Sequence, residues 1–250
     1  MATVVVTGAT GAIGSATVAA LSKRRAQVVA LSRKTCDLSS FASVRAAARD
    51  LNRSGGRIDA LIHAAGVYVD RYQKSADGLE LMFQVNHLGP FLLTNLLRDR
   101  LARGGRVISV TAPSGWRVDV DRLLDRNRFQ AFPWFGAAKA ASLMFTFELA
   151  RRGKRWDVRA NAFHPGVVKS KGMHGVPTWM RVVSRLVARD PDQAGLDLAE
   201  LALSPAFAGT TGWLFRGTRR IDPPKSTLDA AAQSSLWHRS AELVELEGGF

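Results

Sequence analysis

Short apolar runs alternate with longer segments of helical periodicity along most of the chain. The apolar runs predict strands at Thr3–Thr7, Val28–Ser32, Ala60–His63, Arg106–Val110, Val158–Phe163 and Trp213–Phe215. Apolar positions three and four residues apart predict helices at Gly14–Arg24, Phe41–Arg53, Leu79–Arg103, Phe135–Arg152, Asp192–Leu203 and Leu236–Val244. This alternation is typical of a parallel sheet with helices on both faces. The sequence therefore predicts a single α/β domain over residues 1–250.

Two further features refine this picture. Gly104-Gly105 follows the third predicted helix and is expected to end it, because glycine readily adopts the left-handed conformation of a helix cap. Residues 169–190 are irregular in pattern and contain Gly172, Gly175, Pro177 and several basic side chains. This stretch is expected to form a short lid or substrate loop within the domain, with a mobile surface connection as the alternative.

The composition agrees with a folded domain in a reducing compartment. The chain has 250 residues, 46% of them hydrophobic, which is enough for one sizeable core. It holds one cysteine, so no intrachain disulfide framework is expected. No apolar stretch reaches the length of about 18 residues that a membrane span needs. Met1 to Val6 runs directly into a predicted strand without a basic leader, so a cytoplasmic location is expected.

The formal net charge is +14, which raises the question of an anionic partner. The basic residues are mostly Arg and are dispersed along the chain, with no basic tail and no patch interleaved with aromatic residues. A compositional bias explains this pattern better than a polyanion partner. A small-molecule substrate is expected, and a nucleic-acid or membrane partner is not.

A glycine-rich turn directly follows the first predicted strand and opens the first predicted helix. Such a turn lets the backbone approach a pyrophosphate, which then lies at the helix N-terminus. This context predicts dinucleotide binding by Thr7, Gly8, Thr10, Gly11, Ala12, Ile13 and Gly14. The predicted fold is then of Rossmann type, a doubly wound parallel sheet of roughly six or seven strands.

The end of the second predicted strand favours one nicotinamide cofactor over the other. An acidic residue there would accept hydrogen bonds from a ribose 2′-hydroxyl, whereas this chain has Arg33 and Lys34. Cations at this place favour the 2′-phosphate, so NADPH or NADP is the expected cofactor. The alternative is that both are ordinary surface cations. No metal site is expected.

Motifs in a fixed order make most of the chain resemble the short-chain dehydrogenase/reductase superfamily, especially its retinol-dehydrogenase-like branch. After the glycine-rich turn come Asp37-Leu38, Ile58–Gly66, Val85–Phe91, Phe135–Lys139 with its continuation to Arg152, His164–Val168 and Leu236-Trp237. The resemblance implies the Rossmann-type fold and oxidoreductase chemistry with a nicotinamide cofactor.

The resemblance also implies roles for single residues. Asn86 matches a structural and proton-relay asparagine, and Lys139 matches a lysine that binds the cofactor ribose. Further cofactor contacts are implied for Asp37, Leu38, Ala64, Ala65, Gly66, Pro165, Gly166, Val168 and Ser170.

The departures from the superfamily pattern concern its catalytic hydroxyls. Phe135 stands where a Tyr is expected four residues before Lys139, and its ring cannot donate a proton. Ala112 stands where the catalytic Ser is expected, with Thr111 and Ser114 as the neighbouring hydroxyls. Ala112, Pro113, Ser114 and Phe135 are therefore expected to line the substrate pocket.

Other departures are smaller. His63 replaces an Asn, and the glycine spacing at 8, 11 and 14 is atypical for the superfamily. A helix and a strand common in this branch are missing between Lys34 and Asp37.

Only two tyrosines exist, Tyr68 and Tyr72, just after Gly66. Tyr68 is therefore a candidate replacement acid, and a pocket wall is the alternative for it. Asn86, Lys139 and Tyr68 are the candidate catalytic residues.

The leading hypothesis is an atypical NADPH-dependent ketoreductase that acts without the Ser-Tyr-Lys triad, with the proton supplied by substrate or water. There is a weaker resemblance to the triad-less ketoreductases of antibiotic biosynthesis, of the angucyclinone or simocyclinone type, whose substrates are aromatic polyketides. The alternatives are a non-redox NADP-binding protein, and a cyclase or dehydratase that reuses the pocket. The oligomeric state stays open.

Overall fold

A seven-stranded sheet forms the centre of the molecule in a computed structural model, which describes residues 1–167 and 189–250. The strand order is β2-β1-β3-β4-β5-β6-β7, and β7 alone of these runs antiparallel to its neighbour. The strands are β1 (Thr3–Thr7), β2 (Gln27–Leu31), β3 (Ile58–His63), β4 (Leu101–Val110), β5 (Arg159–Phe163), β6 (Leu214–Arg216) and β7 (Arg219–Ile221). The predicted α/β class and mostly parallel sheet are confirmed.

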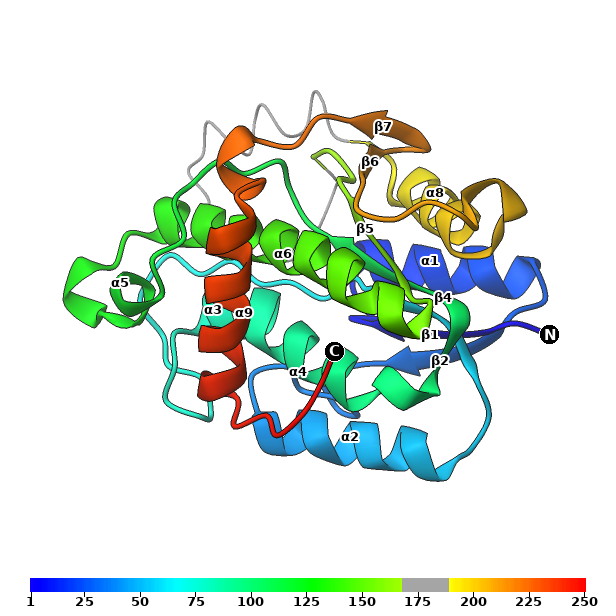
Figure 1. Cartoon of the computed structure of the whole chain (residues 1–250), viewed down its shortest axis with the longest axis horizontal. Coiled ribbons are helices and arrows are strands. Elements are labelled where there is room, and N and C mark those ends of the chain that lie inside the picture. Colours follow the sequence, from blue (N-terminus) through cyan, green and yellow to red (C-terminus); the bar gives the residue numbers. More distant parts are fainter. Residues whose placement is uncertain (168–188) are drawn as a thin grey trace.

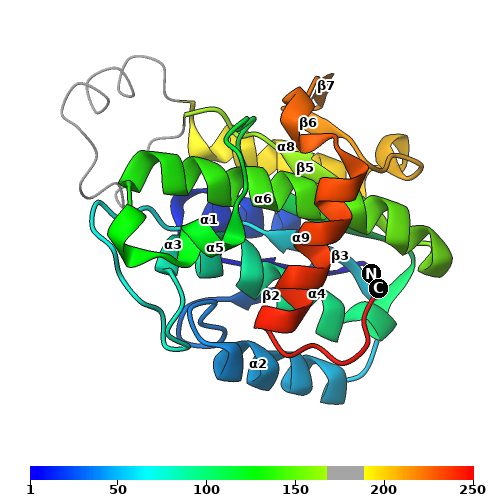
Figure 2. The same cartoon turned by 60° about the vertical axis from the view of Figure 1, so that its left-hand side comes forward.

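Helices cover both faces of this sheet (Figure 1). They are α1 (Ala12–Lys23), α2 (Phe41–Arg53), α3 (Leu81–Phe83), α4 (Gly89–Leu96), α5 (Val120–Leu124), α6 (Ala131–Arg152), α8 (Pro191–Leu203) and α9 (Ala230–Leu243). One hydrophobic cluster joins the sheet to α1 and α8, and a larger one joins it to α2, α4, α6 and α9. In Figure 2, α1 and α8 lie behind the sheet and α9 lies in front. The two clusters give the three-layer arrangement that the alternating pattern predicts.

The third predicted helix, Leu79–Arg103, is wrong in its second half. The helical part runs from Leu81 through a π-helical turn at Gln84–Leu88 to the end of α4, and β4 already begins at Leu101. Gly104 and Gly105 therefore lie inside a strand and do not end a helix. Gly104 has a φ of 82° and its N–H donates to Asp157 O, while the pairing of β3 with β4 shifts register before Arg106. The two glycines mark a bulge, which a local pattern does not separate from a helix end.

Two predicted helices begin too late. The helix predicted to start at Phe135 starts at Ala131, and the one predicted to start at Leu236 starts at Ala230. In the second case Asp229 accepts hydrogen bonds from the N–H groups of Ala231 and Ala232 and so caps the helix. The first two turns of α9 contain mostly Ala, Gln and Ser, so they carry no apolar periodicity.

The connection after β2 is short. Residues 32–40 lead from β2 directly to α2, whose first turn is capped by Ser40 through a bond from Ser43 N. No helix or strand intervenes, in agreement with the segment missing between Lys34 and Asp37. As a result β2 is the edge of the sheet.

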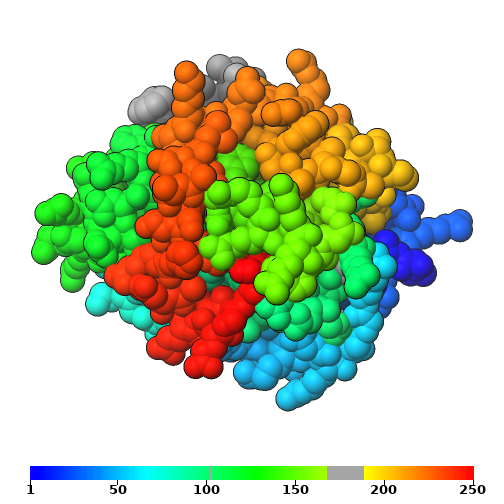
Figure 3. Space-filling view, in the orientation of Figure 1, coloured from blue at the N-terminus to red at the C-terminus, as the bar shows by residue number. Residues whose placement is uncertain are grey.

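The helix α9 and residues 244–250 cover α4 and α6. Trp237 packs edge-on against Phe91 of α4 at 4.9 Å and stacks on Phe145 of α6 at 5.8 Å between ring centroids. Beyond α9, Phe250 packs on Trp156 and its N–H donates to Asn95 Oδ1. Figure 3 shows this red segment at the surface beside the green atoms of the middle of the chain.

Much of the positive charge has structural partners. Among the described residues, seven arginine side chains donate hydrogen bonds to backbone oxygens. They are those of Arg45, Arg57, Arg98, Arg100, Arg106, Arg151 and Arg152. Arg100, for example, bonds the carbonyls of Leu51 and Asn52 at the end of α2. A cation at a helix C-terminus satisfies carbonyls that have no partner within the helix. These arginines therefore stabilise the fold.

Candidate functional site

The glycine-rich turn forms a cradle that only glycine permits. Gly8 has a φ of 65°, and a Cβ at this residue would lie 2.6 Å from Ala65 Cα. A Cβ at Gly14 would lie 2.1 Å from Gly8 O. These contacts hold the turn against the segment after β3 and let α1 begin at Ala12. The N–H groups of its first turn have no partner within the helix, which is the arrangement that binds a phosphate.

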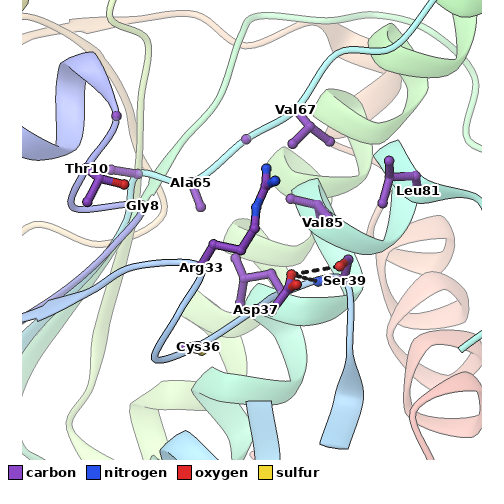
Figure 4. Close-up of a pocket in the computed structure, with 14 residues that line it drawn as sticks. Gly8, Thr10, Arg33, Cys36, Asp37, Ser39, Ala65, Val67, Leu81 and Val85 are labelled. Carbon is purple, nitrogen blue, oxygen red and sulfur yellow. Dashed lines mark hydrogen bonds between the residues drawn. The ribbon is translucent and has the colours of Figure 1, made fainter. Parts of the chain in front are cut away.

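A pocket of about 320 Å³ lies beside this cradle (Figure 4). It is lined by Gly8, Thr10, Gly11, Arg33, Cys36, Asp37, Leu38, Ser39, Ala64, Ala65, Gly66, Val67, Leu81 and Val85. Nine of the predicted cofactor residues are in this lining. Ser39, Cys36, Val67, Leu81 and Val85 were not predicted, because their apolar or small side chains resemble those of the core.

The remaining predicted residues of the turn contribute in other ways. Thr7 is buried, and its Oγ1 lies 3.5 Å from the N–H of Ala65, which donates to it. Ala12, Ile13 and Gly14 form the first turn of α1 and do not line the pocket. Lys34 is exposed and lies outside the pocket lining.

Arg33 and Asp37 give the pocket its charge. Arg33 extends across the opening between Ala65 and Val85 (Figure 4), and it joins no ion pair among the described residues. Asp37 Oδ1 accepts hydrogen bonds from Ser39 N at 2.9 Å and Ser39 Oγ at 2.7 Å. Burial, and then the charge of Asp37, raise the pKa of the Cys36 thiol to about 12. Cys36 is therefore a neutral packing residue at this wall.

Asn86 lies in the π-helical turn and fixes the segment after β3. Its Oδ1 accepts from Val67 N at 3.0 Å, and its Nδ2 donates to Val67 O at 2.9 Å. Both ends of the amide are therefore committed to one backbone residue, and Asn86 positions the segment that carries Tyr68. A π-helical turn often marks a functional site, since it reorients one side chain of a helix.

Lys139, Phe135 and Tyr68 come together where this segment meets α6. Lys139 Nζ lies 5.5 Å from the Phe135 ring centroid, and the Tyr68 ring packs edge-on against Phe135 at 5.5 Å. A Cβ at Gly66 would lie 3.2 Å from Lys139 Nζ and 2.9 Å from Asn86 Oδ1. Burial lowers the pKa of Lys139 to about 8. Burial, followed by the nearby Asp70, raises the pKa of Tyr68.

The two hydroxyls nearest to Ala112 are already bonded to α6. Thr111 Oγ1 donates to Lys139 O at 2.9 Å, and Ser114 Oγ donates to Gly136 O at 2.6 Å. A hydroxyl has a single proton, so neither donates one to a substrate in this arrangement. Ala112 and Pro113 lie between them and add no donor.

Trp116 fixes the end of the same segment on α6. A Cβ at Gly136 would lie 2.2 Å from Trp116 Cδ1, so only glycine lets the indole lie against the helix there. Of the other aromatic residues near this end of α6, Phe132 is half exposed, whereas Trp134 is buried.

Three histidines lie near the site, and two of them are hydrogen-bonded in the core. His63 is buried and bonds Thr94 Oγ1, and His87 is buried and bonds Ser240 Oγ. Burial lowers the pKa of each of the two to about 3, so both are neutral at physiological pH. Burial also lowers the pKa of His164, with Arg216 and Arg189 acting in the same direction.

Pro165 and Gly166 follow β5 at the carboxyl edge of the sheet. Gly166 has a φ of 78°, and a Cβ on it would lie 3.2 Å from Arg189 Cδ. Val168, Ser170 and all but the last two residues of the predicted lid lie outside the described residues. Where the structure is described, no helix is long and apolar enough to cross a membrane. The same residues hold no group of three His, Cys, Asp or Glu side chains suited to a metal ion.

Known proteins are similar to this chain in sequence and in fold. Residues 2–208 match a family model described as enoyl-(acyl carrier protein) reductase. The chain is 31% identical to retinol dehydrogenase 13 of Homo sapiens over 281 aligned positions, which cover 98% of this chain and 85% of that protein. It is 34% identical over 271 positions to DnrU of Streptomyces sp. (strain C5), which carries the name of a daunorubicin C-13 ketoreductase, with coverage of 97% and 92%.

Solved structures agree with these relatives. A protein from Mycobacterium paratuberculosis superposes with a TM-score of 0.80 at 27% identity, over 100% of this chain and 96% of that one. A 3-ketoacyl-(acyl-carrier-protein) reductase from Brucella melitensis with NADH (TM-score 0.67, 19% identity, 90% and 98% covered) shares the fold. So does BdcA with NADPH (TM-score 0.66, 19% identity, 86% and 92% covered). The family match, the two relatives and the sheet order agree, and the chain belongs to the short-chain dehydrogenase/reductase family.

Proposed function

We propose that this protein is an NADPH-dependent ketoreductase of the cytoplasm that acts without a serine–tyrosine hydroxyl pair. One observation carries the proposal. The dinucleotide pocket leads by way of Gly66 to Lys139, whereas the side-chain hydroxyls expected at positions 112 and 135 are absent and those of Thr111 and Ser114 are bonded to α6. These observations support a cofactor site that is kept without the usual acid.

The pocket suits a phosphorylated dinucleotide. The N-terminus of α1 and the Gly8 turn would hold the pyrophosphate. Arg33 would pair with the 2′-phosphate, and the second carboxylate oxygen of Asp37 is available to the adenine amino group. Lys139 would donate to the ribose beside Gly66, which has no Cβ to crowd Nζ. When bound, the nicotinamide would supply the hydride, and Pro165 with Gly166 would border it after β5.

The proton for the product hydroxyl would come from the substrate or from water. Tyr68 is the one phenol beside Lys139 and Phe135, but burial raises its pKa, which makes it a poorer acid. A ketone with a neighbouring phenol carries its own donor, already held by an internal hydrogen bond. The apolar face of Phe135 would strengthen that bond by excluding water. We therefore propose a phenolic aromatic ketone, of the aromatic polyketide kind, as the substrate class.

The relatives support this choice to different degrees. DnrU carries the name of a daunorubicin C-13 ketoreductase, and the alignment with it covers 97% of this chain. Retinol dehydrogenase 13 supports oxidoreductase chemistry with a different substrate. Neither name says anything about the residues at positions 112 and 135. The argument for a missing hydroxyl pair rests on Ala112 and Phe135 of this chain.

The experiment compares a phenolic ketone with the same ketone methylated on the phenol oxygen. NADPH oxidation is followed at saturating cofactor, and the reduced product is identified by mass spectrometry. Turnover of the phenolic ketone and loss of turnover with the methyl ether are expected, since methylation removes the internal donor. Equal rates would refute substrate assistance and direct attention to Tyr68 or water. Tight NADPH binding without oxidation by any ketone would favour a non-redox NADP-binding protein, or a cyclase or dehydratase.

A further inference from the structure

Lys139 is a half-buried cation without a hydrogen-bond acceptor among residues 1–167 and 189–250. It lies in α6, and its Nζ donates no hydrogen bond and joins no ion pair within the described part of the chain. Its neighbours are the Phe135 ring and Gly66, and Asn86 Oδ1 approaches Gly66 from the same side. That amide oxygen already accepts from Val67 N. A buried ammonium normally has an anionic or strongly polar partner, because burial of an unpaired charge is costly.

No neighbouring element supplies the missing negative charge. Tyr68 comes from the segment after β3, Asn86 from the π-helical turn, Phe135 from α6 itself, and Thr111 from the end of β4. Tyr68 alone among these is ionisable, and burial raises its pKa so that it stays neutral. Burial is also the one cause that lowers the pKa of Lys139, so no charged side chain acts on it. The counter-charge therefore has to come from what binds in the site.

We infer that the Lys139 ammonium group holds the substrate oxygen in place of the missing hydroxyl pair, and donates a hydrogen bond to it as it becomes an alkoxide. This rests on the proposed ketone reduction. An ammonium group has three N–H donors, so one can face the substrate while the others bond the ribose. Phe135 supports this role by presenting an apolar ring on one side of Nζ, because a charge–charge contact is stronger where water is excluded.

The step balances without a further reactant. The hydride that bound NADPH would supply, with NADPH oxidised to NADP, would form a bond to the carbonyl carbon as its bond to the nicotinamide breaks. The π electron pair of the carbonyl would then move to its oxygen. Lys139 stabilises that negative oxygen and keeps its own protons. The proton then reaches the oxygen from the phenol of the substrate or from water, which leaves phenolate or hydroxide.

The test replaces Lys139 by Met, which has a similar length and no charge. Lys154→Met is the matched control, since Lys154 is exposed beyond the far end of α6. NADPH binding is measured by calorimetry, and kcat is then measured at saturating NADPH and ketone. We expect kcat of Lys139→Met to fall by about 10²–10³, the usual effect of one lost oxyanion donor, even when the cofactor site is filled. The control should keep the native kcat.

A pH profile gives a second readout, and its wild-type limb does not depend on how the variant folds. The wild-type kcat should fall as pH rises through about 8, where Lys139 loses its charge, and the residual kcat of Lys139→Met should lack that limb. Full kcat of Lys139→Met at saturating NADPH, with only weaker cofactor binding, would overturn the inference and leave Lys139 a ribose ligand. A wild-type kcat that is flat from about pH 7 to about pH 9.5 would overturn it as well. A wild-type protein that reduces no ketone would instead refute the proposed function.

Discussion

The two buried histidines predict a steep loss of stability in mild acid. His63 is 3% and His87 1% exposed, and each bonds one hydroxyl through Nε2. Those hydroxyls donate onward, Thr94 to Pro90 O and Ser240 to Leu236 O, so each must accept from an Nε2–H group. Nδ1 of both rings is then an unprotonated nitrogen without a partner. Protonation would place an unpaired charge in the core.

The sign and size follow from the two protonation states. Burial lowers the pKa of both histidines from 6.5 to about 3, so between these values the unfolded chain binds protons that the folded chain does not. Their contribution to stability is complete above about pH 6.5 and is lost as pH falls toward 3. A pH of 5 lies about 1.5 units below the ordinary histidine pKa. Each ring therefore lowers the free energy of unfolding by about 2 kcal/mol at pH 5, at 1.36 kcal/mol per unit. The two together amount to about 4 kcal/mol, a large part of the stability of a typical domain.

The assay is urea unfolding between about pH 5 and about pH 7.5, with the unfolding free energy obtained by linear extrapolation. His63→Gln and His87→Gln keep an N–H donor near the Nε2 position and do not titrate in this range. Each should reduce the pH dependence by about one proton, or about 1.36 kcal/mol per pH unit, and the double variant by about two. His238→Gln removes an exposed histidine of α9 and is the control.

Other groups cancel in this comparison. Burial raises the pKa of Glu80, which acts with the opposite sign, but it does so equally in the native protein and in the variants. If both glutamine variants keep the native pH slope, the tautomer argument and the neutral state of the rings are refuted.

Two further predictions concern the site. Arg33→Ala should weaken NADPH binding by about 1.5–3 kcal/mol, the range for a charge-assisted contact, and should leave NADH binding nearly unchanged, as measured by calorimetry with both cofactors; equal affinity of the native protein for NADPH and NADH would contradict it. Phe135→Tyr alone should not give rapid reduction of simple ketones, because Ala112 still lacks a hydroxyl and Thr111 and Ser114 donate to α6. A fast general reductase from this one change, followed by NADPH oxidation, would show that the site is a triad with a single lesion.

Local sequence patterns were sufficient to predict the fold class and the conformation of the glycine-rich turn. Apolar alternation and the glycine-rich turn after β1 are local features, and the physics behind them is local as well. A strand needs alternating or continuous apolar residues, and the Gly8 turn needs a residue without Cβ. The absence of a helix and strand after Lys34 was equally readable, since it is a matter of chain length.

Local patterns failed where two structures share one pattern. The π-helical turn at Gln84–Leu88 and the bulge at Gly104 both lie in a stretch that reads as a single long helix. The early start of α9 depended on Asp229 as a cap, because Ala, Gln and Ser show no periodicity. Longer-range pairing of β4 with β3 decided between helix and strand there.

Which polar groups of the site remain free to act depends on packing between distant segments. The sequence shows that Thr111 and Ser114 carry hydroxyls, but not that both donate to carbonyls of α6. In the sequence Arg33 and Lys34 are equally good candidates for binding a 2′-phosphate, whereas in the fold only Arg33 of the two lines the pocket. The sequence likewise does not show that Lys139 lacks a hydrogen-bond acceptor among the described residues. The partner of a donor is set by chain segments tens of residues away, so its availability depends on packing that no local pattern contains.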